Sequence, residues 1–297
     1  MPVRSESFTI VTPCLNMGRF LRATIESVAR NLGPDDEYFI VDGGSTDETL
    51  EIIKACTDRI TWWTSEPDRG YGDALRKGFA RSRAEFQCWI NAGDLLLEGA
   101  VDQARRHLTA TGADFIFGDD FLIDAAARVL GFSRGYVASF RDWVLFGGWT
   151  PLQDACFWRR SLYERVGGID PGLQLAADYD LFLRFGLRGR CRYVPVAFSA
   201  FRQHEGQRSI VMASRYAEER QRCRQRALSA MRIWRVEQRL REAIFWVRSR
   251  HRDHILRPAW DLRRLHGLPV ASLPSRSYGV AGDRTPPEAS ERLKPFR

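Results

Sequence analysis

Residues 37–56 read EYFIVDGGSTDETLEIIKAC, and this stretch indicates how the chain is built. The apolar run 37–42 has the length of a buried strand and ends at Asp42. The two glycines that follow permit a tight turn and the close approach of a ligand to the backbone. Ser45 and Glu48 have the spacing of a capping box, which predicts that a helix begins there. Strand, glycine turn and helix in this order indicate one unit of an α/β sheet.

The same alternation continues on both sides of this unit. The spacing of apolar residues predicts strands at 7–13, 60–64 and 86–90 and helices at 20–32 and 73–82. Short apolar strands that alternate with helices indicate a mostly parallel sheet with helices on both faces. Ligands of such sheets bind at the carboxyl ends of the strands. Asp42 and Asp94 each follow a strand, so we expect them on one rim of the sheet.

Beyond residue 113 the pattern is mixed. We expect a strand pair at 114–124 and 127–132, a strand and short helix within 149–168, a helix at 177–189 and a long strand at 191–201. The predicted domains are a catalytic domain at 1–209, with a nucleotide-binding half at 7–113 and an acceptor half at 114–209, a basic helical extension at 210–266 and a disordered tail at 267–297.

Basic charge is concentrated near the end of the chain. Between positions 215 and 264 there are fifteen arginines and six acidic residues, which accounts for the whole net charge of +8. Apolar and aromatic residues at helical spacing within 232–250 fit either a helix packed on the core or a helix on an anionic membrane surface. Nucleic acid also fits the charge, but no nucleic-acid-binding motif accompanies it, so we expect no such partner.

Several observations bear on the compartment. No run of eighteen apolar residues predicts a membrane span, and the first residues lack the apolar stretch of a signal peptide. The six cysteines show no CxxC pairing and are predicted to be free thiols in a reducing environment. We therefore expect a cytoplasmic protein, peripheral on the inner face of the cell membrane if the basic segment binds lipid.

Five segments in this order resemble the family 2 glycosyltransferases of the GT-A fold. They are TPCLNMGRFLRATIESV (12–28), YFIVDGGSTDETLEII (38–53), SEPDRGYGDALRKGF (65–79), WINAGDLL (89–96) and QDACFWRRSLYERVGGIDPGLQLAADYDLFLR (153–184). The resemblance covers about residues 7–209 and implies a Rossmann-like sheet flanked by helices. It also implies a UDP-, GDP- or dTDP-linked sugar donor, a divalent cation (Mg²⁺ or Mn²⁺) and inverting transfer to a glycan or lipid-linked hydroxyl, as in polysaccharide or glycolipid assembly.

The resemblance assigns the donor pocket to the first half of the chain. It implies that Asp42 binds the nucleotide base, that Thr12 and Pro13 form the pocket edge, and that Asp73 lies near base and ribose, with Asn91 beside them. From the residues alone, Asp42 equally fits a strand–turn–helix connection, and 67–70 is a good turn. Arg69 in this turn is a candidate phosphate ligand, and Asp47 is expected in the first turn of the helix.

The stretch NAGD at 91–94 is the candidate metal site. Mg²⁺ commonly uses only one or two protein carboxylates, so Asp94 suffices as the main anchor. The family motif usually has two or three acidic residues here, and this chain keeps the last. The alternative is that Asp94 is a helix N-cap. The resemblance places His204 near the metal or diphosphate, and Arg202 and Arg208 beside it could bind phosphate.

An inverting transfer needs a carboxylate that accepts the proton of the attacking hydroxyl. Asp178 matches the family's base position, while Asp180 should point elsewhere and brace the helix. A plain N-cap is the alternative for Asp178. Asp119, Asp120 and Asp154 are candidates for the acceptor side; FGDDF could also be a surface turn, and Asp154 could compete as the base.

Two other functions remain open at this point. A non-catalytic nucleotide-sugar-binding protein would explain the thinned metal motif and Ala177, which stands where an acidic residue is frequent. A nucleotidyltransferase would share the parallel sheet and the metal. It normally needs a basic, glycine-rich loop after the first strand, and TPCLNMGRF is not one.

Overall fold

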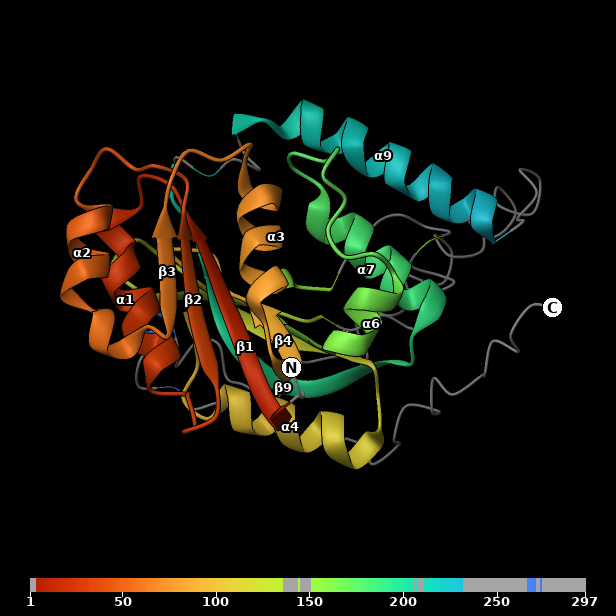
Figure 1. Ribbon diagram of the computed structural model, residues 1–297, viewed down its shortest axis with the longest axis horizontal. Coiled ribbons are helices and arrows are strands. Elements are labelled where there is room, and N and C mark those ends of the chain that lie inside the picture. Colours follow the sequence, from red (N-terminus) through yellow and green to blue (C-terminus); the bar gives the residue numbers. More distant parts are fainter. Residues whose placement is uncertain are drawn as a thin grey trace.

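The computed structural model describes residues 4–135, 144, 151–205, 207, 211–231, 266–270 and 273. One curled sheet forms the centre and helices cover it (Figure 1). The strands are β1 (Arg4–Cys14), β2 (Glu37–Asp42), β3 (Trp62–Ser65), β4 (Ala84–Trp89), β5 (Leu95–Leu96), β6 (Phe115–Ile123), β7 (Val129–Ser133), β8 (Cys156–Arg159) and β9 (Cys191–Arg202). The helices are α1 (Gly18–Ala29), α2 (Thr49–Ala55), α3 (Tyr71–Arg81), α4 (Ala100–Thr111), α6 (Arg160–Arg165), α7 (Ala177–Arg188) and α9 (Ala213–Ala230), with 3-10 turns η1 (Thr57–Arg59) and η2 (Gln153–Ala155).

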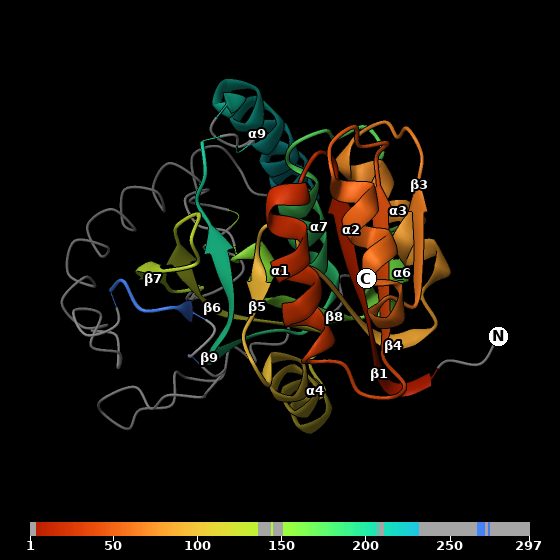
Figure 2. The ribbon, with the colours of Figure 1, turned by 90° about the vertical axis from the view of Figure 1, so that its left-hand side faces the viewer.

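The strand order is β3-β2-β1-β4-β8-β6-β9-β5, with β7 paired to β6. The first four strands along this path are parallel. In the second half, β8 is antiparallel to both β4 and β6, whereas β6 and β9 are parallel. Because crossovers between parallel strands are right-handed, α1 and α2 cover one face of β1–β3 and α3 covers the other (Figure 2). The predicted α/β sheet with helices on both faces is confirmed.

The start of α2 differs from the prediction. The helix begins at Thr49, and Ser45 does not cap it, because the Ser45 hydroxyl donates to Asp42 Oδ1 instead. Asp47 lies just before the helix and accepts the N–H groups of Gly18 and Thr49, both at 3.0 Å. Burial alone would raise the pKa of Asp47, but these hydrogen bonds lower it. The capping box was a wrong prediction, since a buried carboxylate competes for its hydroxyl.

Two alternative interpretations of acidic residues are also wrong. Asp94 is not an N-cap, because β5 follows it and α4 begins only at Ala100, after Gly99. Asp119 and Asp120 do not form a surface turn: both are buried within β6, which pairs with β8 and β9 on its two sides. The predicted strand at 114–124 is present, and only the alternative that its polar residues lie at the surface is wrong.

The C-terminal segment is described in two pieces. α9 agrees with the predicted basic helix, whereas residues 232–265, with the apolar and arginine-rich stretch, lie outside the described residues. Residues 266–270 pair with the β7 hairpin: Val129 N donates to Leu268 O at 2.9 Å, and Val270 N donates to Ala127 O at 3.0 Å. This part of the predicted disordered tail is therefore packed, and Val270 is buried.

All six cysteines are free, as predicted, and five of them are buried. Within the described part of the chain, no helix has the length and apolar character required to cross a membrane.

Candidate active site

The carboxyl ends of β1–β4 lie at one edge of the sheet because these strands are parallel. Asp42 is the last residue of β2 and pairs in register with Cys14 and Ser65, the last residues of its two neighbours. β4 lies two strands from β2, so the turn at 91–94 begins roughly 10 Å from Asp42. The predicted common rim is therefore present.

The Asp42 carboxylate is fully buried and bonded to its own loops. Oδ2 accepts the Ser65 hydroxyl at 2.6 Å and the Ser45 N–H at 3.0 Å. Oδ1 accepts the Ser45 hydroxyl and, more weakly, the Cys14 thiol at 3.7 Å. Burial raises the pKa of the Cys14 thiol well above its usual value, and the Asp42 charge raises it further. This carboxylate holds together the ends of three neighbouring strands.

The glycine pair after Asp42 accommodates a loop of the protein itself. A Cβ on Gly43 would lie 2.9 Å from Asp68 Oδ2. Gly44 has a φ of +87°, and a Cβ there would lie 3.2 Å from the Pro67 nitrogen. In this structure the space expected for a ligand at this turn is therefore taken by the loop 66–70.

Two other predicted donor residues have partners nearby. The Tyr38 hydroxyl donates to Thr12 Oγ1 at 3.1 Å, so the Thr12 side chain is directed into the core, while Pro13 lies beside Val41 in the register of β1 and β2. Asn91 donates to Gln153 Oε1 at 2.6 Å and to Asp94 Oδ2 at 3.3 Å. Asn91 thus links the end of β4 to η2.

Asp73 lies in the first turn of α3 among three basic side chains. It accepts the Arg69 N–H at 3.3 Å, and ion pairs join it to Arg69 at 3.5 Å and to Arg76 and Lys77 at 3.8 Å. Burial would raise the pKa of Asp73, but the Arg69 N–H and the charges of Arg69 and Lys77 outweigh it and lower the pKa. Asp73 therefore stays ionised.

The start of α3 also touches the start of α7. A Cβ on Gly72 would lie 4.0 Å from the Ala177 Cβ and 3.4 Å from the Leu173 carbonyl oxygen. The two helix starts are therefore in contact here, and Asp73 and Asp178 each follow one residue further along their helices. The donor side and the candidate base are therefore neighbours.

Asp94 is buried at the end of β9. Its Oδ1 accepts the Arg202 backbone N–H at 2.9 Å. The Arg202 guanidinium does not bind this carboxylate; it donates to three carbonyl oxygens, of Gly93 at 2.7 Å, Asp124 at 2.9 Å and Ala125 at 3.0 Å. Asp94 thus has hydrogen-bond donors, and the charge of the nearby Arg202 lowers its pKa somewhat, but no ion pair of Asp94 is found among the described residues.

Three buried carboxylates interact electrostatically at this position. Burial raises the pKa of Asp94 to about 8, with a further contribution from the charge of Asp154. Burial and the same Asp154 charge raise the pKa of Asp120 well above its usual value, and burial raises that of Asp154 to about 6. Asp120 Oδ1 and Asp154 Oδ2 are buried without a hydrogen-bond partner in the described structure.

This arrangement fits a cation. Within the described ranges, no group of three or more His, Cys, Asp or Glu side chains could hold a metal by itself. Burial nevertheless makes ionisation of these carboxylates costly, and a divalent ion with further ligands from its substrate would offset that cost. His204 packs against Phe20 with ring centres 5.4 Å apart and the two rings tilted by 46°. Burial and the nearby charges of Arg202 and Arg19 lower the pKa of His204, which favours the neutral form that binds metals.

Asp178 is half-buried in the first turn of α7. It is not the N-cap, which is Ala176, and its Oδ1 accepts the N–H of Tyr179 at 2.8 Å. Burial raises the pKa of Asp178 to about 6, against the lowering effects of that N–H and of the Arg220 charge. The charges of Asp154 and Asp178 both raise the pKa of the buried Cys156 thiol, so this thiol lies near both carboxylates.

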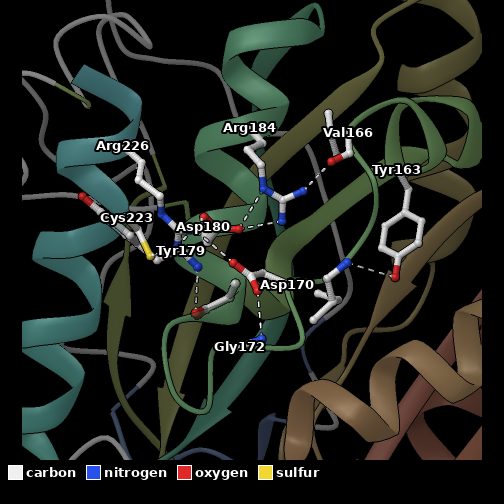
Figure 3. A network of polar contacts seen from close by, with 11 residues as sticks. Tyr163, Val166, Asp170, Gly172, Tyr179, Asp180, Arg184, Cys223 and Arg226 are labelled. Carbon is white, nitrogen blue, oxygen red and sulfur yellow. Dashed lines mark hydrogen bonds and ion pairs between the residues drawn. The ribbon is translucent and has the colours of Figure 1, made fainter. Parts of the chain in front are cut away.

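The remaining predicted residues have structural partners or lie outside the described residues. Asp180 braces the helix as expected, bound to Arg184 at 2.8 Å and to Arg226 at 3.4 Å (Figure 3). Asp119 accepts the Gly135 N–H at 2.8 Å and the Tyr193 hydroxyl at 3.0 Å, and burial raises its pKa to about 7. Arg208 lies outside the described residues.

Sequence reasoning missed Glu219, which contacts the segment before Asp178, and did not foresee that Gln153 contacts Asn91. It also missed a cavity of about 520 Å³ between the α6–α7 loop, α7 and α9, which includes Asp180 but none of the predicted catalytic, nucleotide or metal residues that are described. No local pattern marks Glu219, because its backbone partners lie 43 to 45 residues earlier in the chain.

Comparison with known proteins places this site in a family. Residues 9–144 match the model for glycosyl transferase family 2. Over 184 residues the chain is 29% identical to a PGL/p-HBAD biosynthesis glycosyltransferase of Mycobacterium tuberculosis, covering 60% of this chain and 68% of that one. The match to the family model ends before Asp178, and the curated relative extends the similarity over a longer part of the chain.

Two solved structures share the fold. TarS 1–349 of S. aureus in complex with UDP-GlcNAc aligns with a TM-score of 0.55 at 16% identity, covering 68% of this chain and 60% of that one. The mannosyltransferase PcManGT of Pyrobaculum calidifontis in complex with GDP-Man and Mn²⁺ aligns with a TM-score of 0.52 at 14% identity, covering 69% and 59%. The chain thus spans about 60% of each of these structures, and the likeness shows the GT-A fold. Together with the match of residues 9–144 to the family model, these comparisons show a chain that is similar to family 2 glycosyltransferases.

Proposed function

We propose that the protein transfers a sugar from a nucleotide-diphosphate donor to a hydroxyl group, with inversion at the anomeric carbon and with the help of a divalent cation. The observation that supports the proposal is a set of linked carboxylates near the carboxyl ends of the parallel strands. Asp42 ends one strand and Asp94 follows another, and both strands pair with β1. The charge of Asp154 acts on Asp94, and the charges of Asp154 and Asp178 act on the same Cys156 thiol.

Asp42 and Asp73 are proposed to hold the nucleoside, with Thr12, Pro13 and Asn91 at the pocket edge. All four lone-pair positions of Asp42 are used, so a base must replace one contact. The Cys14 thiol is the weakest donor, at 3.7 Å, and is the contact that a base N–H would replace. Arg69, whose side chain is 81% exposed, is free to turn toward a phosphate.

Asp94 is proposed as the main protein anchor of the cation, with His204 as a second ligand. When bound, Mg²⁺ or Mn²⁺ would stabilise the charge that develops on the leaving diphosphate. Because its pKa is about 8, Asp94 ionises fully at neutral pH only when a positive charge is near. Arg202, and Arg208 beyond the described residues, remain proposed phosphate contacts; the guanidinium of Arg202 would have to leave its carbonyl partners.

Asp178 is proposed as the general base. Its carboxylate takes the proton of the acceptor hydroxyl while the hydroxyl oxygen attacks the anomeric carbon and the bond from that carbon to the diphosphate oxygen breaks. A pKa of about 6 keeps Asp178 mostly ionised at pH 7 and close enough to neutrality to accept a proton efficiently. Asp119, Asp120 and Asp154 are proposed to lie on the acceptor side.

For the acceptor we propose a glycan or lipid-linked hydroxyl at the inner face of the cell membrane. The arginines between positions 215 and 264 support this, because each basic residue near an anionic surface contributes about 1 kcal/mol of binding. Co-sedimentation with phosphatidylcholine vesicles, with and without phosphatidylglycerol, tests it. We expect binding only to the anionic vesicles and its loss at high salt; equal sedimentation with both vesicles would contradict it.

The transfer itself is tested with a panel of UDP-, GDP- and dTDP-linked sugars plus Mn²⁺ or Mg²⁺, reading release of the nucleoside diphosphate. We expect one donor class to be turned over, and chelation to stop the reaction. Nucleotide binding without release from any donor, even with lipid extract as acceptor, would instead support a nucleotide-sugar-binding protein.

A further inference from the structure

Glu219 of α9 is a buried acid that binds the backbone just before α7. Only 2% of its surface is exposed. Its carboxylate accepts three successive N–H groups, from Gln174 at 3.4 Å, Leu175 at 2.9 Å and Ala176 at 3.0 Å. These groups belong to the positive end of α7, where a carboxylate is favoured. Glu219 therefore holds the segment 174–176 from outside the helix.

The same face of α9 carries two further groups beside Asp178. The Arg220 guanidinium lies 4.7 Å from the ring centre of Tyr179 and 5.5 Å from that of Tyr216. The charge of Asp178 is the main cause of the raised pKa of Tyr216, so this hydroxyl lies close to the carboxylate. Asp178 is thus faced by Tyr216 and Arg220 from α9 and by Cys156 from β8.

A second contact fixes α9 further along. Arg226, two turns after Glu219, pairs with Asp170 at 3.0 Å and with Asp180 at 3.4 Å. Figure 3 shows this group between α9 and α7, with Cys223 beside it. In Figure 1, α9 runs above α7 at the top of the view. α9 lies outside the residues that the family model matches. It thus contacts both the segment 174–176 before α7 and the first turns of α7.

We propose that α9 completes the catalytic centre and that Glu219 is a positioning residue, which holds 174–176 so that Asp178 reaches the acceptor hydroxyl. This inference rests on the proposed function, in which Asp178 is the base. A shift of about 1 Å in a reacting group can lower a rate by roughly 100-fold, so a rigid support for Asp178 has a measurable effect on turnover.

Two substitutions separate positioning from simple stabilisation. Glu219→Gln keeps the size of the side chain, but its amide nitrogen would face a backbone N–H, and the carboxylate charge is lost. Glu219→Asp keeps the charge on a shorter side chain. Arg226→Gln is the matched control: it loosens α9 on the same face, while Asp180 keeps Arg184 and Asp170 keeps the Gly172 N–H.

The readouts are kcat, donor KM and the pH dependence of diphosphate release by the full chain, with thermal melting in parallel. For Glu219→Gln we expect kcat to fall about 10- to 100-fold with donor KM within threefold, and the acidic limb of the pH profile to move. Glu219→Asp should recover part of kcat. Arg226→Gln should lower the melting temperature with kcat within threefold.

Hydrogen exchange supplies a second measurement that needs no turnover. The amides of 174–176 should exchange at least tenfold faster in Glu219→Gln than in Arg226→Gln. Equal exchange in the two variants, or wild-type kcat in Glu219→Gln, overturns the inference.

Asp178→Asn is measured in parallel. It separates the role of Asp178 as the base, which belongs to the proposed function, from the role of Glu219 as a positioning residue. An active Asp178→Asn shows that the base is misassigned, and the inference falls with it. A wild type that turns over no donor overturns both. An inactive Asp178→Asn together with an unaffected Glu219→Gln overturns this inference alone.

Discussion

The carboxylates at the two halves of the sheet differ in how the protein surrounds them. Asp42, on the parallel half, accepts four hydrogen bonds from its own strand ends and loops. Asp94, Asp120 and Asp154, on the mixed half, crowd together with raised pKa values, and two of their oxygens lack partners. The first site is satisfied by the fold, whereas the second is electrostatically costly without a ligand. The mixed half is therefore where chemistry is expected and the parallel half where binding and stability are combined.

The largest effect should come from the candidate base on the mixed half. Asp178→Asn should lower kcat by about 10²- to 10⁴-fold, because the amide cannot accept the acceptor proton. Binding of the nucleoside diphosphate, measured by calorimetry, should stay within threefold of wild type. Loss of binding instead would place Asp178 on the donor side and contradict its assignment.

Asp94→Asn tests whether the crowded carboxylates are kept for a cation. We expect metal-stimulated turnover to fall by about 100-fold or more, since several kcal/mol of charge stabilisation depend on the anchor. The melting temperature without metal should stay about the same, because burial already keeps Asp94 mostly protonated at pH 7 and the Arg202 N–H keeps an acceptor in the asparagine. A lower melting temperature with normal metal response would make Asp94 structural.

Asp42→Asn is the counterpart on the parallel half. Its amide would turn a donor toward the Ser45 and Ser65 groups, so we expect the free energy of unfolding to fall by about 1–3 kcal/mol. Urea unfolding measures this. If stability is unchanged and only nucleotide affinity falls, then Asp42 serves binding alone and the contrast between the halves weakens.

The pH dependence of turnover should report Asp178. With a pKa of about 6 in the folded protein, activity should fall below pH 6 and be roughly tenfold lower at pH 5. The effect of acid on stability has the opposite sign. The pKa of Asp178 is higher in the folded than in the unfolded protein, so the folded protein binds a proton more readily between about pH 6 and 4. The contribution of Asp178 to the free energy of unfolding therefore rises as the pH falls through this range. A melting temperature that falls in step with activity would point to unfolding instead.

The smallest effect concerns the turn after Asp42. Gly44→Ala should lower stability by about 1 kcal/mol or more, because φ is +87° and the new Cβ would press on the Pro67 nitrogen. Gly70→Ala is the control, with φ of +108° and no atom within 4 Å of the new Cβ. A larger loss for Gly70 than for Gly44 would show that backbone strain, not the packed loop, dominates.

Patterns of apolar residues predicted most strands and helices and the common rim, because these follow from local periodicity, but they missed the two-residue strand β5 and the helix α4. They failed where a polar side chain has a distant partner. Ser45 was assigned to a cap because the buried Asp42 that binds it cannot be read from spacing. The strand that carries Asp119 and Asp120 was predicted, but the burial of this polar pair was not, since it depends on the neighbouring strands. Glu219 escaped because its partners, 174–176, lie far away in sequence. The roles of the site residues remain predictions.

The position of β8 has a consequence for synthesis. β8 pairs with β4 on one side and with β6 on the other, so it lies inside the sheet although residues 156–159 follow both neighbours in sequence. Until these residues leave the ribosome, β4 presents an open edge of unpaired backbone groups that can recruit another chain. A fragment that stops before β8 should therefore aggregate, and trimming the protein to the segment matched by the family model would not yield an independently folding unit.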